Sequence, residues 1–235
     1  MTVKEIMARL ESLGSPQIKN IHLKHGIKEP LFGVKVSDLK PIQKQIKKDY
    51  QLAKDLYATG NADAMYLAGL IADDKKMTKK DLQSWVKQAD SDTLCGYTVP
   101  WVAAESLHGY ELALEWIESK EAHIAAAGWS TLSNLVALKP DSELDLKALK
   151  ALLARVGKTI HASANCVKYN MNNFIISVGA YVTPLTEEAI ATAKKMGVVK
   201  VDMHGTAREM PDAIAYIKKI EDRGSLGKKK KTVKC

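Results

Sequence analysis

Four stretches of this 235-residue chain share one unusual composition, and together they constrain the fold more than any other feature. They are rich in apolar and small residues: "NADAMYLAGLIAD" (61–73), "YTVPWVAAES" (97–106), "AHIAAAGWSTLSNL" (122–135) and "NCVKYNMNNFIISVG" (165–179). Each reads as a helix with little polar surface, and all but the last directly follow a more polar helix. Their starts lie roughly 30 to 45 residues apart, the spacing of helix-pair repeats. The pattern predicts an all-α fold, an α-solenoid of HEAT-like helix pairs, and a globular helical bundle is the competing arrangement.

The rest of the chain fits the same class. "TVKEIMARLESLG" places apolar residues at helical spacing and ends in Gly14, a common helix stop. Further helices are expected over 51–59, 61–73, 78–89, 97–107, 109–119, 121–137, 143–156, 163–179, 186–196 and 210–222. Only "GVVKVDM" (197–203) resembles a strand, and we expect it to be an irregular connection.

The segment from Glu29 to Asp49 predicts a loop that leads into a helix. Pro30 restricts the backbone and Gly33 permits a bend, while the neighbouring apolar side chains can anchor the loop in the core. Those anchors are Leu31, Phe32 and Val34. Ser37 is a candidate cap for the helix that follows.

That helix is amphipathic and basic. Its apolar face holds Val36, Leu39, Ile42 and Ile46. The other faces hold Lys40, Lys44, Lys47 and Lys48. We therefore expect a row of lysines on the surface at this place, suited to phosphate groups.

Basic charge gathers in two zones of the chain, whose formal net charge is +8. Residues 1–60 hold eleven basic and six acidic side chains, and residues 223–235, "RGSLGKKKKTVKC", hold six basic and none acidic. The expected organisation is one HEAT-like repeat domain over 1–222 and a basic tail over 223–235. Basic zones attract phosphate, although a short lysine run is as often only a solvated end. The lysines of the tail that we consider for DNA binding are Lys228, Lys229, Lys230 and Lys231.

Cysteine usage and hydropathy exclude several classes of protein. Cys95, Cys166 and Cys235 are odd in number and widely spaced, which argues against a zinc site or a disulfide framework. No stretch of about 18 apolar residues occurs, so neither a signal peptide nor a membrane span is indicated. We expect a cytoplasmic protein without a metal or other cofactor.

Several of these segments together resemble one family. "LFGVKVSDLKPIQKQI", "DLYATGNADAMYLAGLIAD", "YTVPWVAAES" and "AAAGWSTLSNLV" are similar to the DNA alkylation repair family, the AlkD-like HEAT-repeat proteins. The resemblance covers most of the chain and implies a helical solenoid that cradles duplex DNA. Some members excise cationic alkylated purines, and others lack the catalytic residues.

The chemistry of that excision needs little from the protein. An N3- or N7-alkylated purine is already a cationic leaving group, so a carboxylate and electron-rich aromatic faces suffice to stabilise the charge that develops on the sugar. The resemblance implies an Asp, two Trp and an Arg in active members, which bind the lesion without base flipping.

This chain departs from that catalytic pattern. When the family's Val-Pro pair is aligned with Val99-Pro100, the catalytic acid falls at Gly96 and the nearby tryptophans fall near Ser91 and Asp92. The second tryptophan falls near Phe174 and the arginine near Ala127. None of these positions is carried over as catalytic.

Two other carboxylates are the nearest candidates for a catalytic acid. Glu105 forms an i, i+4, i+8 stripe with Tyr97 and Trp101, so one helix face would carry an acid and two aromatic rings. Asp92 lies at the start of the same predicted helix. For either carboxylate, capping or a surface ion pair is the competing interpretation.

Further aromatic and polar residues on the next two repeats complete the predicted DNA surface. They are Trp129, Lys168, Tyr169, Asn172, Asn173 and Phe174. The competing interpretation is that the aromatic side chains only fill the core, as we expect for Trp85 and Trp116.

Two functions from different classes remain open at this point. One is a protein that binds duplex DNA on its concave helical surface and excises alkylated purines, with Glu105 or Asp92 as the acid. The other is a noncatalytic DNA-binding or protein-scaffolding solenoid. The missing acid favours the second, and the basic zones keep DNA as the partner in both DNA-binding alternatives.

Overall fold

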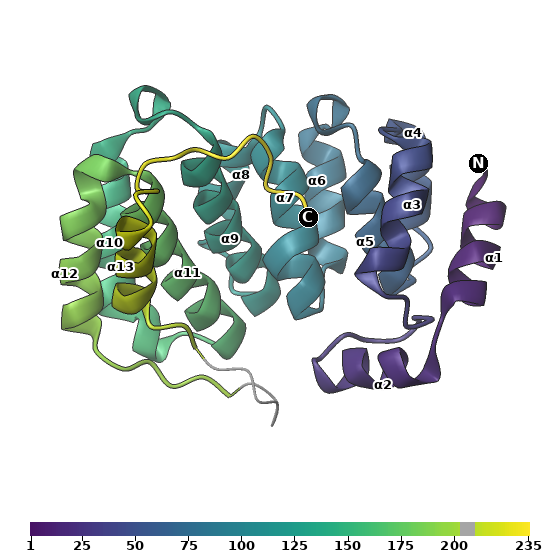
Figure 1. Ribbon diagram of the computed structural model, residues 1–235, viewed down its shortest axis with the longest axis horizontal. Coiled ribbons are helices and arrows are strands. Elements are labelled where there is room, and N and C mark those ends of the chain that lie inside the picture. Colours follow the sequence, from purple (N-terminus) through teal and green to yellow (C-terminus); the bar gives the residue numbers. More distant parts are fainter. Residues whose placement is uncertain (203–209) are drawn as a thin grey trace. The chain divides into compact units, whose positions relative to one another are not determined.

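The computed structural model describes residues 1–202 and 210–235, and every regular element in these two ranges is helical (Figure 1). Contacts within the chain divide it into two compact units. Unit 1 is Met1–His108 together with Lys234–Cys235, and unit 2 is Gly109–Val233. No helix in the described ranges is long and apolar enough to cross a membrane.

Unit 1 contains the first helix pairs. Its elements are α1 (Val3–Leu13), α2 (Pro16–Lys24), α3 (Val36–Ile46), α4 (Tyr50–Tyr57), α5 (Ala62–Ile71), the 3₁₀ turn η1 (Asp74–Lys76), α6 (Lys79–Gln88), the π-helical turn η2 (Leu94–Thr98) and α7 (Val99–Glu105). The pattern did not predict α2, which buries none of its residues.

Unit 2 continues the helical pattern. Its elements are α8 (Gly109–Trp116), α9 (Ala122–Leu138), η3 (Asp141–Glu143), α10 (Leu146–Thr159), η4 (Ile160–Ala162), α11 (Asn165–Tyr181), η5 (Thr183–Leu185), α12 (Thr186–Met196) and α13 (Ala213–Asp222). Residues 197–202 form no strand, as expected. Residue 203, the last of that stretch, lies outside the described ranges, as do the residues that follow it up to 209.

The four apolar stretches become the buried helices α5, α7, α9 and α11, while α4, α6 and α10 keep one polar face. Small residues permit the close packing. A β-carbon on Gly128 of α9 would lie 2.7 Å from the main-chain nitrogen of Ile117, just after α8, so only glycine fits there. The predicted all-α class, with HEAT-like helix pairs, is confirmed.

The loop that leads into α3 is held by a buried carboxylate. Asp63 of α5 is 5% exposed and accepts hydrogen bonds from the main-chain N–H groups of Phe32, Gly33 and Val34, at 2.6, 3.0 and 3.1 Å. Leu31 is buried beside them. The predicted rigid loop is therefore present, and its anchor is an acid on the neighbouring helix.

Two local predictions need correction. Ser37 does not cap α3, because the helix begins one residue earlier, at Val36, and the Ser37 hydroxyl contacts Asp38 instead. The helix expected over 97–107 begins earlier, in the π-helical turn η2, before α7 continues to Glu105. Such turns are rare and are found often at functional sites.

Candidate nucleic-acid interface

The predicted stripe on α7 brings two aromatic rings together. The ring centroids of Tyr97 and Trp101 lie 6.0 Å apart. The ring of Tyr66 from α5 is nearly perpendicular to that of Trp101, with 5.5 Å between the two centroids. Trp101 is only 4% exposed, whereas Tyr97 is 37% exposed and Glu105 is half-buried. Tyr97 and Glu105 thus reach the surface, whereas Trp101 is buried and contacts the rings of Tyr66 and Tyr97.

A buried acid lies beside this stripe, in the turn after α5. Asp74 is 1% exposed, and its Oδ2 lies 2.9 Å from the Nζ of Lys48. Its Oδ1 lies 2.6 Å from the Nζ of Lys234, near the end of the sequence. Asp74 therefore holds two cations at once.

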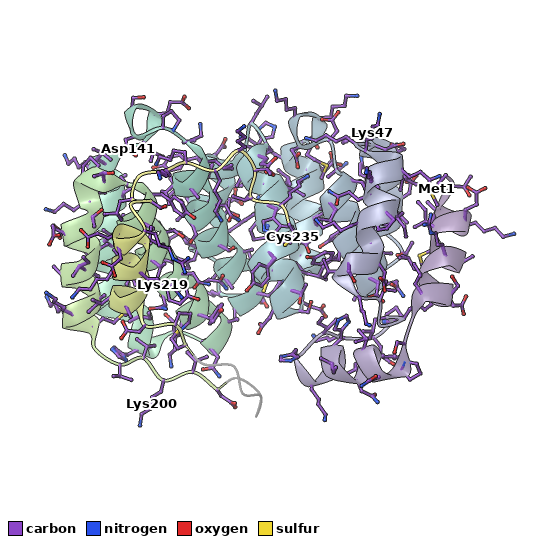
Figure 2. The ribbon with its side chains drawn as sticks, in the orientation of Figure 1. Met1, Lys47, Asp141, Lys200, Lys219 and Cys235 are labelled. Atoms are coloured by element: carbon purple, nitrogen blue, oxygen red, sulfur yellow. The ribbon has the colours of Figure 1, made fainter. Side chains whose placement is uncertain are left out.

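The last two residues of the sequence, Lys234 and Cys235, belong to unit 1 and contact it near Asp74. The side chain of Lys234 is 7% exposed, and its Nζ also donates to the main-chain oxygen of Ala72 at 3.2 Å. Lys40 donates to the main-chain oxygen of Cys235, and Tyr66 forms a hydrogen bond with Cys235. Figure 2 labels Cys235, the end of this segment.

The groups around Asp74 shift the pKa values of their neighbours. Burial lowers the pKa of Lys234 although Asp74 and Glu105 favour its charged form. A hydrogen bond with Asp74 raises the pKa of Lys48, and the charge of Glu105 adds to that effect. Burial and the bond to Cys235 raise the pKa of Tyr66. Glu105 thus acts on the same charges as Asp74.

The predicted lysine row lies on and after α3. Lys44 and Lys47 are exposed, and Figure 2 labels Lys47. Lys40 is half-buried and donates to the main-chain oxygen of Cys235, and the side chain of Lys48 is 56% exposed although it is paired. Lys44 and Lys47 are the members of the row that the structure leaves open to a phosphate group.

Within unit 2, part of the basic tail is bound to the fold. Lys229 lies 2.8 Å from Oδ1 of Asp141 and donates to the main-chain oxygen of Val136. Lys230 lies over the ring of Tyr181, 5.7 Å from its centroid. Lys228, Lys230 and Lys231 are exposed, whereas Lys229 is a structural contact.

The predicted aromatic contacts of unit 2 lie in its core. Trp129 and Phe174 have no exposed surface, and their ring centroids pack 5.3 Å apart. A side chain without exposed surface cannot stack on a base, so in this structure both are packing residues. Lys168, Tyr169 and Asn173 are half-buried on the same helix as Phe174, α11.

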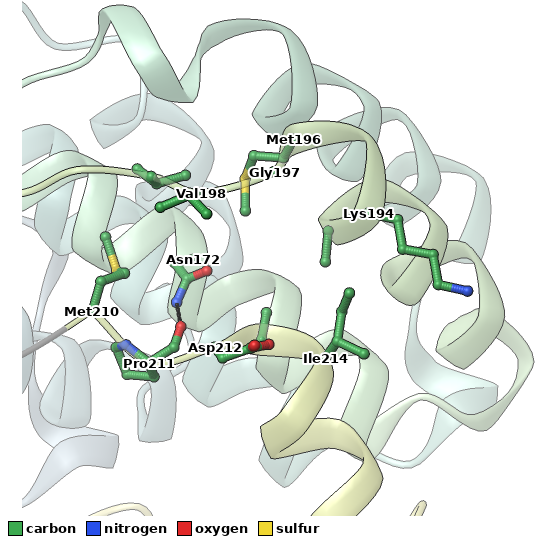
Figure 3. Close-up of a pocket in the computed structure, with 12 residues that line it drawn as sticks. Asn172, Lys194, Met196, Gly197, Val198, Met210, Pro211, Asp212 and Ile214 are labelled. Atoms are coloured by element: carbon green, nitrogen blue, oxygen red, sulfur yellow. Dashed lines mark hydrogen bonds between the residues drawn. The ribbon is translucent and has the colours of Figure 1, made fainter.

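Asn172 of α11 is engaged inside unit 2. It is 2% exposed and lines a pocket of about 450 Å³ that also includes Met196 and Val199 (Figure 3). Its amide donates to the main-chain oxygen of Pro211 at 2.8 Å. Asn172 therefore fixes the chain that enters α13 instead of offering its amide to DNA.

The segment that the resemblance aligns with the catalytic helix includes the π-helical turn. Gly96 lies inside that turn, and the half-buried Asp92 lies before it. Glu105 and Asp74 are the acids that act on the charges of Lys48 and Lys234. Asp92 and Glu105 both stay predictions as catalytic acids.

Sequence reasoning missed Asp74, Tyr66 and Lys234. The acid pair "DD" directly after an apolar helix, Asp73 and Asp74, was a usable signal, because acids next to a buried helix need partners. No local pattern could have connected Asp74 with Lys234, since the two lie far apart in the sequence.

Comparisons with known proteins agree with this fold. The family described as DNA alkylation repair enzyme matches residues 6–216, so the chain belongs to the DNA alkylation repair family. It is 30% identical to the Listeria innocua protein Lin0241 and 29% identical to the Listeria monocytogenes protein Lmo0209, over 228 residues in each case. These matches cover 95% of this chain and 99% of each relative.

A solved structure is also similar over its whole length. It represents a new family of proteins related to the HEAT-like repeat DNA glycosylases, with affinity for branched DNA structures. This chain is 39% identical to it, with a TM-score of 0.92, and all of both chains is covered.

Proposed function

We propose that this protein binds DNA, with a preference for branched structures, and does not remove bases. The observation that carries the proposal is the full-length similarity, at 39% identity, to a protein with affinity for branched DNA. The position that the family resemblance gives to the catalytic acid is Gly96, which supports binding without excision.

The lysines of unit 1 supply the electrostatic part of this binding. Lys44 and Lys47 are exposed and close in sequence, and each phosphate that a lysine neutralises releases condensed counterions. Tyr97, with 37% of its surface exposed, offers a ring on which an unpaired base can stack. The stack of base pairs is interrupted at a branch point but not within a regular duplex, so base faces become available for stacking there, which is why a combination of lysines and an exposed ring favours branched DNA.

Fluorescence anisotropy with a four-way junction, a fork and a linear duplex of equal length tests the proposal. We expect the junction to bind more tightly than the duplex and affinity to fall steeply with salt. The double variant Lys44→Glu, Lys47→Glu should weaken junction binding by about tenfold or more, because it replaces two attractive charges by repulsive ones.

Lys80→Glu provides the matched control for charge when it is compared with each single variant of the row, Lys44→Glu or Lys47→Glu. Lys80 is exposed near the start of α6 and lies outside the lysine row, so Lys80→Glu changes the charge without changing the row. Equal effects of the Lys80 variant and the row variants would argue against a DNA surface on α3. Absence of binding to all three DNAs would reject the proposal and leave the protein-scaffolding alternative.

A second candidate function, excision of alkylated purines, is favoured by one observation. Glu105 is half-buried, shares the stripe with two aromatic rings and acts on the charges of Lys48 and Lys234. Release of N3- or N7-methylated purines from alkylated duplex DNA is the assay that separates this candidate from binding alone.

A further inference from the structure

The end of the sequence is fixed to unit 1 by buried contacts. The ammonium group of Lys234 is enclosed by Asp74 at 2.6 Å and by the main-chain oxygen of Ala72 at 3.2 Å, with 7% of the side chain exposed. A lysine is almost never this deeply buried unless it is paired. Lys234 is therefore a specific buried contact of unit 1 and does not merely rest on its surface.

This contact has a cost as well as a gain in free energy. Burial of a charged ammonium is costly and lowers the pKa of Lys234, whereas the pairing with Asp74 at 2.6 Å favours its charged form. A ligand that binds the released state more tightly than the covered state can therefore shift the segment toward release.

The same two residues cover groups that DNA would use. Lys40, a member of the lysine row, donates to the main-chain oxygen of Cys235. Tyr66, whose ring is nearly perpendicular to that of Trp101, forms a hydrogen bond with Cys235. Lys48, the last member of the row, is bound to Asp74 at 2.9 Å. The main-chain oxygen of Cys235 and the carboxylate of Asp74 thus engage two of the four lysines.

We propose that Lys234 and Cys235 cover part of the DNA surface of unit 1, and that binding of branched DNA displaces them. This inference rests on the proposed function and extends it, since it adds Tyr66 and Lys40 to the DNA surface and assigns the segment a regulatory role. DNA supplies phosphate to Lys40 and the face of a base at the branch point to the ring of Tyr66 in exchange for Cys235. The alternative is that the segment only stabilises the fold and stays in place when DNA binds.

The first experiment follows the Lys234 ammonium directly in the full-length protein. In NMR spectra of protein labelled with ¹⁵N-lysine, a buried and paired ammonium exchanges slowly with water and gives its own signal, which Lys234→Ala identifies by its loss. We expect saturating four-way junction DNA to remove this signal from the unsubstituted protein. A signal that persists unchanged at saturation overturns the proposal.

The second experiment compares two neighbouring acids. Asp74→Asn removes the partner of Lys234 and releases Lys48, whereas Asp73→Asn removes the same charge from an acid that is paired only with Lys76, at 3.5 Å, among the ion pairs described. General electrostatics predicts similar small gains in DNA affinity for both variants. Displacement predicts a gain of about fivefold or more for Asp74→Asn alone.

The dependence of DNA affinity on salt concentration tests the same two variants independently. Each lysine that becomes free to bind phosphate steepens the slope of log affinity against log salt by about 0.9 on duplex DNA. We expect Asp74→Asn, but not Asp73→Asn, to steepen it. Equal affinities and slopes for the two variants overturn the proposal.

Folding and function are separated by controls. If Asp74→Asn unfolds, a protein that lacks residues 234–235 is used in its place. This truncated protein should bind junction DNA with the same or higher affinity although it has lost a positive charge. Weaker binding contradicts displacement. If no variant and no unsubstituted protein binds any DNA, the proposed function itself fails, and displacement by DNA fails with it. Binding by the unsubstituted protein with a persistent ammonium signal refutes the displacement alone.

Discussion

Gly33 lies against Lys19 so closely that a β-carbon on Gly33 would stand 2.4 Å from the main-chain nitrogen of Lys19. The backbone of Gly33 also has a φ of +80°, in the left-handed region that favours glycine. Two independent constraints thus require glycine where the loop turns toward α3.

Gly33→Ala should therefore destabilise the protein strongly. We expect a loss of about 2 kcal/mol or more in the free energy of unfolding, measured by urea denaturation, since the variant combines a left-handed backbone with a clash against main chain. Gly60 is the control, because its φ is +70° but nothing lies within 4 Å of the β-carbon position. Gly60→Ala should cost less than Gly33→Ala, and equal costs would show that the contact with Lys19 is unimportant.

Asp63→Asn should loosen the same loop from the other side. The carboxylate accepts three main-chain N–H groups, and an amide nitrogen cannot replace either oxygen as an acceptor. We expect a loss of about 2–3 kcal/mol and faster amide hydrogen exchange at Phe32, Gly33 and Val34. The exposed Asp55, on α4, is the control, and Asp55→Asn should change stability by less than about 0.5 kcal/mol.

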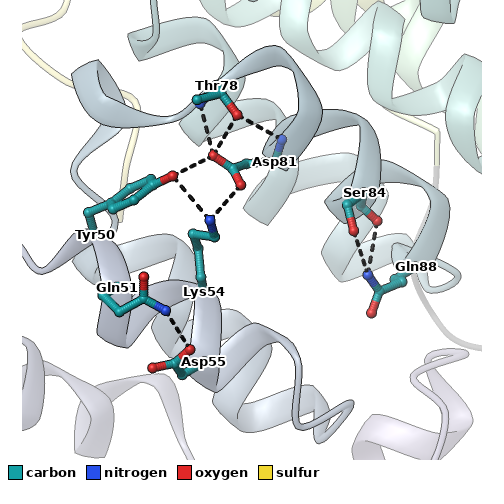
Figure 4. A network of polar contacts seen from close by, with 8 residues as sticks. All are labelled: Tyr50, Gln51, Lys54, Asp55, Thr78, Asp81, Ser84 and Gln88. Atoms are coloured by element: carbon teal, nitrogen blue, oxygen red, sulfur yellow. Dashed lines mark hydrogen bonds and ion pairs between the residues drawn. The ribbon is translucent and has the colours of Figure 1, made fainter.

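The network around Asp81 should make stability depend on acid pH (Figure 4). Burial alone would raise the pKa of Asp81, but hydrogen bonds from Lys54, Thr78 and Tyr50 outweigh it and hold the pKa well below its ordinary value of 3.8. Because the folded state lowers this pKa, the network contributes stability above pH 3.8 and loses that contribution as the pH falls further.

Asp81→Asn tests this dependence. At pH 7 the variant should be less stable by about 1–3 kcal/mol, because it loses the charged acceptor for Lys54 at 2.8 Å and Tyr50 at 2.8 Å. The difference from the unsubstituted protein should shrink when thermal unfolding is measured below pH 3.8. A difference that stays constant from pH 7 to pH 2.5 would contradict the role given to the carboxylate.

Glu105→Gln separates binding from excision. Under the proposed function, neither the unsubstituted protein nor the variant releases methylated purines above the rate of spontaneous depurination, and junction affinity changes by less than about threefold, since one surface charge is lost. Release by the unsubstituted protein that disappears in the variant, with DNA affinity retained, would instead establish Glu105 as a catalytic residue.

Periodicity predicted the helix pairs well, because α5, α9 and α11 each bury more than half of their residues and such composition is visible in the sequence. It did not predict α2, which has no buried residue. It also did not predict the π-helical turn over Leu94–Thr98, since such turns are rare and its close contact with Gly69 of α5 is not visible in the sequence.

The candidate site was only partly accessible to the same reasoning. Helical spacing placed Tyr97 and Trp101 side by side correctly, and the rings do meet. It could not say that Trp129 and Phe174 lie fully in the core, because an apolar aromatic residue on a small-residue helix fits a surface stripe and a buried one equally well. The pairing of Asp74 with Lys234 depends entirely on tertiary structure.

The last two residues of unit 1, Lys234 and Cys235, follow unit 2 in the sequence. They are therefore synthesised after all the other residues of unit 1. During synthesis, residues 1–108 leave the ribosome and can fold while Lys234 has not yet been added to the chain. Asp74 must therefore pass through a period without its buried partner, with Lys48 as the cation already at hand. In a nascent chain arrested before residue 234, unit 1 would lack the contacts of Lys234 and Cys235.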